Sequence, residues 1–398
     1  MKKRIMIIGA GRGQVGLIQA SKRLGYTTIV ASIPGNYPGF DYADEICYVD
    51  ISNPEEVYES AKSLNIDGIA TACLDTGIVS VGYVCDKLNL CGLSYRAAKI
   101  SNDKLLMKDA FEKYGVNTAK YRKISCEDDL HKACKDLTFP LILKAVDLQG
   151  SRGIYICRDI QSVIENYSKV SEETKKDYCI IEEFIEGEEF GAQAFVYDNE
   201  VLFVMPTGNE TYLSSTNIPV GHFVPYLEKD VDSRVIEDQV KRAINALGFN
   251  NCAINVDLIK KGNEYYVIEL TGRVGANCLP ELTQIYYDIS YYDMIATLSV
   301  RDERFQSMMK TEYKSYGAGY AKMLFSEKSG TIKSIECGLK NEDYVYEVTF
   351  FVKPGETVNK FRNSKDCIGQ VIVKGKDMED CNKNMQRLLD SIKIEFSE

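Results

Sequence analysis

The sequence predicts an α/β fold that passes into α+β segments, arranged in two or three domains. The chain has 398 residues and a mass of 44.8 kDa, which is more than one hydrophobic core usually serves. Over roughly the first hundred residues, short apolar runs alternate with helical patterns, and this alternation is typical of a parallel sheet wrapped by helices. From Lys120 onward, hairpin-like strand pairs mix with helices. The two patterns indicate a parallel α/β domain followed by α+β domains.

The first part of the chain is expected to alternate strands and helices. The predicted strands are Arg4–Ile8, Thr27–Ala31 and Gly68–Ala72, and the predicted helices are Gly16–Leu24, Pro54–Leu64 and Thr76–Leu88. A break is expected over about Cys91–Ser101. The helix Asp103–Tyr114 should follow and end at Gly115, because glycine is favourable just beyond a helix C-terminus.

The rest of the chain is expected to combine helices with strands that pair in hairpins. Ser125–Leu137 predicts a helix capped by Ser125, with Asp128 close to the position that a capping box requires. The other predicted helices are Ile160–Val170, Val231–Leu247 and Met378–Ile392. The predicted strands are Leu141–Lys144, Gly153–Cys157, Cys179–Phe184, Phe190–Tyr197, Val201–Met205, Cys252–Ile259, Glu264–Leu270, Tyr344–Val352 and Gln370–Lys374.

Composition excludes several classes of function. The net charge is −10, the pI is about 5.1 and there is no basic block, so a nucleic-acid partner is disfavoured. No apolar run reaches membrane-spanning length, and the apolar run after Met1–Arg4 is too short for a signal peptide. The 13 cysteines form no CxxC pair, which argues against a zinc or redox motif. We therefore expect a cytoplasmic protein with free thiols.

The glycine-rich segment after the first strand has two interpretations. Its spacing Gly11-x-Gly13-x-x-Gly16 matches the dinucleotide-binding fingerprint. A dinucleotide site also needs a carboxylate at the end of the second strand to hold the ribose. Here that strand ends in Ala31-Ser32, without a carboxylate. A tight strand-to-helix turn is therefore favoured over the site of a nicotinamide-dependent dehydrogenase.

One strand and the loop after it carry groups suited to phosphate. Lys144 ends an otherwise apolar strand, where burying a charge is costly unless it meets an anion. The following loop contains Gly150, Ser151, Arg152 and Gly153, a flexible and donor-rich run that could fold over phosphates. An exposed lysine beside a hairpin loop is the alternative.

A second strand leads into Glu182-Glu183-Phe184-Ile185, in which carboxylates adjoin apolar side chains. Backbone groups at such a strand edge can read an adenine while Phe184 and Ile185 lie against its faces, and Glu189 could hold ribose hydroxyls. An acidic, solvated turn is the alternative.

A predicted hairpin places acidic residues on neighbouring strands. Asp257 and Glu269 could point to one face and hold Mg²⁺, which prefers oxygen ligands. Arg273 could neutralise the charge that develops on a transferred phosphoryl group. A surface ladder of ion pairs is the alternative.

Lys104 lies in the first turn of a helix, where its charge opposes the helix dipole. Local stability does not explain a lysine there, whereas a contact with an anion would. A solvated lysine, as most first-turn lysines are, is the alternative.

Taken in order, these segments resemble the ATP-grasp superfamily, especially its carbamoyl-phosphate-synthase-like, biotin-carboxylase-like and amino-acid-ligase members. No single motif is diagnostic, but their order and spacing together are fairly specific. The resemblance covers nearly the whole chain. It implies a Rossmann-like domain over residues 1–95, an ATP-grasp module over 96–300 with a small lid at about 120–187, and a C-terminal α+β domain over 301–398.

The resemblance also implies roles for the residues that carry it. The residues implied to bind ATP are Lys104, Lys144, the loop Gly150–Gly153, Glu182, Glu183, Phe184, Ile185 and Glu189. Asp257 and Glu269 would bind Mg²⁺, with Mn²⁺ as a substitute, and Arg273 and Lys144 would spread the transferred charge. The family usually has Asn where this chain has Thr271, so that metal position is in doubt and Asn277 is a substitute.

The chain has two histidines. His222 lies where similar ligases place a residue near the acyl phosphate, although a loop histidine without a chemical task is the somewhat better interpretation. His131 lies on a charged helix and should be exposed to solvent.

The implied function is an ATP- and Mg²⁺-dependent ligase that joins a small carboxylate to an amine through an acyl phosphate, releasing ADP and phosphate. A phosphoribosylglycinamide-synthetase-like purine enzyme and a carbamoyl-phosphate-synthase-like subunit share this chemistry. A nucleotide-binding regulatory protein is the alternative from another class, for which Thr271 is the only indication. A homodimer is common among similar enzymes.

Overall fold

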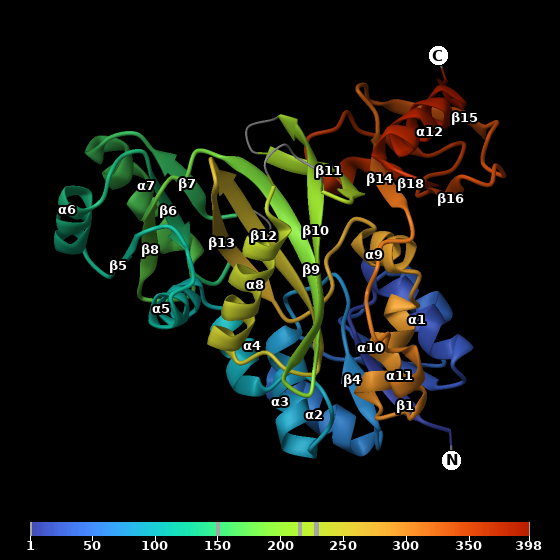
Figure 1. Cartoon of the computed structure of the whole chain (residues 1–398), viewed down its shortest axis with the longest axis horizontal. Helices are drawn as coiled ribbons and strands as arrows, with labels where there is room; N and C mark the ends of the chain where they lie inside the picture. Colours follow the sequence, from blue (N-terminus) through green and yellow to red (C-terminus); the bar gives the residue numbers. More distant parts are fainter. Residues whose placement is uncertain (1, 149–151, 214–216, 227–230, 398) are drawn as a thin grey trace. The chain divides into compact units, whose positions relative to one another are not determined.

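The computed structural model describes residues 2–148, 152–213, 217–226 and 231–397. The chain divides into two compact units, and both contain helices and strands (Figure 1). Unit 1 comprises Met1–Val204, Asp230–Val274 and Tyr292–Phe305, and unit 2 comprises Met205–Lys229, Gly275–Tyr291 and Gln306–Glu398. Within the described ranges, no helix is long and apolar enough to cross a membrane.

Unit 1 begins with a four-stranded parallel sheet in the order β3-β2-β1-β4. Its strands are β1 (Arg4–Ile8), β2 (Thr27–Ser32), β3 (Glu45–Tyr48) and β4 (Gly68–Ala70). The helices of this region are α1 (Arg12–Arg23), α2 (Pro54–Ser63), α3 (Ile78–Leu88) and α4 (Tyr95–Ser101), with a short 3-10 turn η1 (Pro38–Tyr42). Apolar side chains of the strands pack with Val57 and Val84 of the helices. The alternating pattern is as predicted, but β3 and α4 were not foreseen, and α4 occupies most of the expected break.

The glycines of the first strand-to-helix turn make close packing contacts. A Cβ at Gly9 would lie 2.6 Å from the side chain of Leu74, one at Gly13 would lie 2.6 Å from Cβ of Cys73, and one at Gly16 would lie 2.5 Å from the ring of Tyr292. Gly9 also has φ +92°, a conformation that glycine adopts without strain. The tight-turn interpretation accounts for this segment.

A second, antiparallel sheet follows in the order β5-β8-β6-β7. Its strands are β5 (Tyr121–Ile124), β6 (Leu141–Ala145), β7 (Ile154–Cys157) and β8 (Cys179–Glu183). Helices α6 (Glu127–Asp136) and α7 (Ile160–Glu173) pack on it through a shared apolar core. The predicted cap of α6 is wrong, because Cys126 is the N-cap residue and makes no side-chain cap bond.

Helix α5 (Lys104–Tyr114) precedes this sheet, with Asp103 as its N-cap and Gly115 in the left-handed conformation at its end. Unit 1 is completed by α8 (Ser233–Leu247) and by an antiparallel sheet that runs β13-β12-β9-β10. The strands are β9 (Glu188–Tyr197), β10 (Glu200–Leu213), β12 (Cys252–Lys261) and β13 (Glu264–Thr271). Helices α10 (Tyr291–Ser299) and α11 (Arg304–Met308) contribute their residues up to Phe305.

In unit 2, β10 continues into a sheet of order β10-β11-β14-β18-β16. The further strands are β11 (Asn217–Val224), β14 (Ala318–Phe325), β16 (Val345–Phe350) and β18 (Cys367–Gly375). A smaller sheet runs β17 (Thr357–Val358), β15 (Gly330–Cys337) and β19 (Ile392–Phe396). The helices of this unit are α9 (Leu279–Tyr287), α12 (Met378–Asp390) and the 3-10 turn η2 (Ser364–Asp366). The elements of this unit that were not foreseen are strands β11, β14, β15, β17 and β19 and helix α9.

Gly13 offers a test of this packing. Gly13→Ala should lower the free energy of unfolding by about 1–2 kcal/mol, because the clash with Cys73 outweighs the better helix propensity of alanine. Cys73 itself has φ +57°, so Cys73→Gly opens space without straining the backbone. The double variant should recover most of the loss in urea denaturation, with Cys73→Gly alone as control. Additive effects of the two changes would contradict the packing explanation.

Candidate active site

Three buried charged side chains meet where α5 approaches the second sheet. The Glu182 carboxylate of β8 lies 3.0 Å from Nζ of Lys108 in α5 and 3.1 Å from Nζ of Lys144 in β6. Lys108 Nζ also donates a 2.6 Å hydrogen bond to Thr118 Oγ1, which in turn donates to the carbonyl of Val267. Lys108, Lys144 and Glu182, called here the lysine–glutamate triad, are all buried.

The charges of the triad depend on one another. Burial alone would raise the pKa of Glu182, but the two adjacent lysines hold it well below its usual range. Burial lowers the pKa of Lys108, and its contact with Glu182 opposes that shift. With both lysines protonated and Glu182 ionised, the triad has a net charge of +1 that no group within it neutralises.

Lys104 lies at the start of α5, close to the beginning of the loop that follows β6. Its Nζ donates a 2.6 Å hydrogen bond to the carbonyl of Leu148. The helix start is fixed by Asp103, whose carboxylate accepts the backbone N–H groups of Leu105 and Leu106 at 3.0 and 3.2 Å. The structure thus places Lys104 at the loop that the sequence assigned to phosphate.

Only part of that loop belongs to the described residues. Gly150 and Ser151 lie outside them. Arg152 is exposed, and Gly153 has φ +63° while its carbonyl accepts the N–H of Ala145 at 2.8 Å. The roles predicted for these four residues remain predictions.

Part of the segment Glu182–Ile185, which is predicted to contact adenine, makes contacts with other parts of the protein. The side chain of Glu182 belongs to the triad, and that of Glu183 accepts the backbone N–H of Thr138 at 3.0 Å. The N–H of Phe184 donates to the carbonyl of Pro140 at 2.9 Å. Ile185 is buried and Glu189 is exposed. The ion pairs of the Glu182 side chain with two lysines were not foreseen. The adenine and ribose roles of this segment remain predictions.

The two predicted metal carboxylates lie opposite each other on β12 and β13. Asp257 pairs with Glu269, and on its other side with Gly191 of β9, so one face of the sheet presents both carboxylates beside a residue without a side chain. The protein around Asp257, and then the charge of Glu269, raise the pKa of Asp257 to about 6. Its side chain is nevertheless open to solvent. Two adjacent carboxylates that remain reachable are a fit for a divalent cation.

Thr271 adds a second observation at this site. It pairs with Asn255 on β12, one position along the same face from the carboxylates. Its hydroxyl is buried and has no hydrogen-bond partner among the described residues. An orphaned oxygen beside two carboxylates also fits a cation or its bound water. Asn277, the predicted substitute, belongs to unit 2 and has φ +54°.

Arg273 is held by a residue that the sequence analysis missed. Its Nε lies 2.6 Å from Oδ1 of Asp75 and its Nη2 lies 2.8 Å from Oδ2, a bidentate pair that is mostly shielded from solvent. Asp75 follows β4, and Cys73 of the same loop donates its N–H to the carbonyl of Val274. An acidic residue just beyond the carboxyl end of a parallel strand was the available signal.

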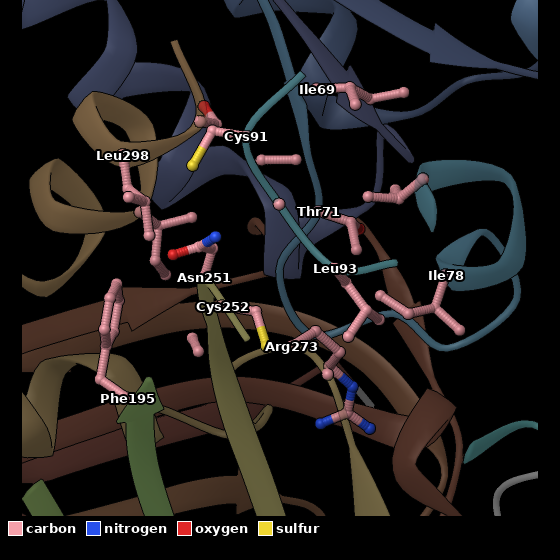
Figure 2. Close-up of a pocket in the computed structure, with 17 residues that line it drawn as sticks. Ile69, Thr71, Ile78, Cys91, Leu93, Phe195, Asn251, Cys252, Arg273 and Leu298 are labelled. Carbon is pink, nitrogen blue, oxygen red and sulfur yellow. The ribbon is translucent and has the colours of Figure 1, made fainter. Parts of the chain in front are cut away.

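Arg273 also lines a small cavity with Thr71, Leu93, Asn251 and Cys252 (Figure 2). Its volume is about 40 Å³, which holds a few water molecules and is far below the roughly 300–1,000 Å³ of a typical ligand pocket. The cavity is therefore not the nucleotide site.

His222 lies in unit 2, on β11 rather than in the loop that was expected. It is buried, and its Nδ1 is 2.8 Å from Oδ1 of Asn209 on β10. Burial lowers its pKa to about 4, so the imidazole is neutral near pH 7. The side chain of His131 is exposed, as predicted.

Two family models match parts of this chain. A family model described as phosphoribosylglycinamide synthetase, ATP-grasp (A) domain, matches residues 102–214, and one described as L-amino acid ligase C-terminal domain 2 matches residues 322–397. The crystal structure of phosphoribosylglycinamide synthetase from Anaerococcus prevotii is 50% identical over 100% of both chains, with a TM-score of 0.86.

Two amino-acid ligases are more distant. The L-amino acid ligase structure from Bacillus licheniformis has a TM-score of 0.81 and 20% identity over 100% of this chain and 99% of that chain, which shows likeness of fold alone. The alanine–anticapsin ligase of Bacillus subtilis (strain 168) is 24% identical over 62% of this chain and 58% of its own length, so the match spans less than two thirds of that relative. With these likenesses and the site described above, the chain belongs to the ATP-grasp superfamily of ligases.

Proposed function

We propose that this protein is an ATP- and Mg²⁺-dependent ligase that activates a carboxylate as an acyl phosphate and transfers the acyl group to an amine. The observation that carries the proposal is the pair of opposite charge clusters in unit 1. The triad leaves a net positive charge beside Lys104, while Asp257 and Glu269 leave adjacent negative charges. Anionic phosphates and a divalent cation are the partners that these two clusters lack.

The chain's residues would divide the work of nucleotide binding. Lys104 and Lys144 would contact the phosphates, and the loop Gly150–Gly153 would cover them. The segment Glu182–Ile185 would meet the adenine and Glu189 the ribose, with the Glu182 carboxylate orienting Lys144. In this division residues 120–187 act as a lid on an ATP-grasp module, after a Rossmann-like first domain.

Asp257 and Glu269 would hold Mg²⁺, or Mn²⁺ in its place, with the Thr271 hydroxyl available to a ligand or a bound water. A bound cation supplies charge neutralisation on phosphate oxygens. The donors on this face are oxygens, which suits a hard cation.

The reaction would begin when the carboxylate of the first substrate attacks the γ-phosphorus of ATP, breaking its bond to the oxygen of the leaving ADP. Lys144 and Arg273 would stabilise the charge spread over the transferred group. An amine would then attack the acyl carbon and expel phosphate. A closed lid would exclude water from the acyl phosphate until that attack. The role that the resemblance implies for His222 remains a prediction.

A narrower candidate is a phosphoribosylglycinamide-synthetase-like reaction, in which glycine is the carboxylate and a phosphoribosylamine is the amine. The 50% identity to the Anaerococcus prevotii structure favours it. The match of residues 322–397 to an L-amino acid ligase domain favours amino-acid substrates with other amines. A homodimer and a cytoplasmic location are part of the same proposal.

Loss of Lys144 should abolish turnover. We expect Mg²⁺-dependent ADP release from the wild type with one pool of carboxylates and amines, and a fall of about 10²-fold or more in Lys144→Met because a phosphate contact is lost. Separate pools of amino acids with amines, and of glycine with phosphoribosylamine, distinguish the two candidates. Lys132→Met is a matched control, since that lysine is exposed on α6.

An unchanged rate in Lys144→Met would overturn the assigned role of the triad. Absence of ATP binding by the wild type would sink the proposed function as a whole.

Replacing Asp257 should separate stability from metal binding. A carboxyl whose pKa is raised in the folded protein destabilises it when ionised, so this cost appears as the pH rises from about 4 through 6. Without divalent cations, the unfolding free energy of Asp257→Asn relative to the wild type should rise by up to about 1 kcal/mol between pH 4 and pH 7.5, a small gain because solvent screens the carboxylate. Thermal unfolding with and without Mg²⁺-ADP measures both effects.

Only the wild type should be stabilised by Mg²⁺-ADP beyond the effect of ADP alone. Equal stabilisation of Asp257→Asn would contradict the assignment of this carboxylate to the metal.

A further inference from the structure

A row of amide side chains crosses the sheet beside the two metal carboxylates. In the register, Asn255 of β12 lies between Gln193 of β9 and Thr271 of β13. Asp257 is two residues further along β12, so all of these side chains belong to one face of the sheet. Gln193 and Asn255 are not needed to explain the fold of the three strands, which pair through their backbones.

These side chains form a hydrogen-bonded chain that ends on Asp257. Gln193 Nε2 donates to Asn255 Oδ1 at 2.7 Å, and Asn255 Nδ2 donates to Asp257 Oδ1 at 3.1 Å. Gln193 Nε2 also donates to the carbonyl of Ala192 at 3.1 Å. This row of hydrogen bonds therefore starts in the interior of unit 1 at Gln193 and ends at the solvent-accessible carboxylate of Asp257.

The order of donors and acceptors along this row follows from the chemistry of the Asp257 carboxylate. An ionised carboxylate only accepts hydrogen bonds, so Asn255 must present its NH₂ group to Asp257. Its carbonyl oxygen then faces Gln193, which must present its own NH₂ group. Asp257 thus fixes the orientation of the Asn255 amide, and Asn255 in turn fixes that of the Gln193 amide. Among the described residues, Oδ2 of Asp257 has no hydrogen bond, so this chain fixes one oxygen and leaves the other for a ligand.

The position of Gln193 argues against an incidental contact. Its side chain is fully buried in a central strand, where an amide costs free energy unless its groups are paired. A valine or isoleucine would suit a buried strand position better. Retaining an amide there is explained if its partner must be oriented, as outer-shell groups orient metal-binding carboxylates.

We propose that Gln193 and Asn255 form a positioning relay that orients the Asp257 carboxylate for a divalent cation. Neither residue is catalytic, because both act through Asp257. The inference rests on the proposed function, since it takes Asp257 to be a metal-binding residue. It adds two residues that determine how tightly this site holds its cation.

The test is direct binding of Mn²⁺ to the full chain with ADP present, followed by electron paramagnetic resonance in the absence of carboxylate and amine substrates. Asn255→Leu should weaken Mn²⁺ binding about 10-fold. Gln193→Met should weaken it about 3-fold, because Asn255 remains but loses the hydrogen bond from Gln193 that holds its side chain in place. Adding Gln193→Met to Asn255→Leu should have no further effect, since the relay is already broken.

Asn384→Leu is the matched control. Asn384 is also buried and donates a single 3.2 Å hydrogen bond to the carbonyl of Lys374, but it belongs to unit 2. Its replacement should change thermal stability without changing Mn²⁺ affinity.

A different result is expected if Gln193 and Asn255 only stabilise the sheet. In that case Asn255→Leu and Gln193→Met lower the melting temperature, as Asn384→Leu does, while Mn²⁺ affinity stays within 2-fold of the wild type, and the relay is disproved. If Asn255→Leu does not fold, Gln193→Met decides by the same criterion. If the wild type binds ADP but no Mn²⁺, the metal assignment in the proposed function fails first, and the relay falls with it.

Discussion

The contact of Glu182 with two lysines is the interaction on which the nucleotide end of the site depends. It joins α5 to β6 and β8 through charges that are almost completely removed from solvent. A buried pair of one lysine and one carboxylate would be neutral and indifferent to phosphate. The second lysine makes the cluster cationic, so the same contact that ties three elements together leaves a charge for a ligand to satisfy. Removing Glu182 would leave two buried ammonium groups side by side, which is far costlier than removing either lysine.

The face of β12 and β13 that holds Asp257 and Glu269 has an excess of negative charge, whereas the triad has an excess of positive charge. Asp257 and Glu269 repel each other, and the charge of Arg273 does not fully offset this repulsion. Its Nε and Nη2 donate to the Asp75 carboxylate, and its Nη1 donates to the carbonyl of Val274. The unbound protein therefore retains unfavourable electrostatic energy at the place where chemistry is proposed. Such local conflict between stability and charge is expected at functional sites. A magnesium–nucleotide complex carries charges of both signs, and each sign is opposite to that of one of the two clusters.

Sequence reasoning succeeded where one element determines the outcome. Apolar periodicity predicted most strands and helices of unit 1, and the predicted hairpin placed Asp257 and Glu269 on neighbouring strands, as the structure has them. It failed where two distant segments determine it. Nothing local to Lys108, at the centre of a charged helix, distinguishes it from a solvated lysine, and Asp75 matters only because Arg273 meets it 198 positions later. His222 was expected in a loop, yet it lies on β11, which pairs with β10 on one side and with β14 on the other.

A single shift in the pairing of β12 and β13 determines whether Asp257 and Glu269 lie opposite each other. The pairing shifts between Asp257 and Leu258, so that Asp257 faces Glu269 while Leu258 faces Val267, and Ile268 is the extra residue of a β-bulge. Without that bulge, regular pairing continued from the hairpin turn would place Glu269 one position away and on the other face of the sheet from Asp257. The two carboxylates would then be neither adjacent nor mutually repelling, and no cation would be needed. The bulge, which no residue type in the hairpin predicts, thus brings the two carboxylates together at the place where we propose that a cation binds.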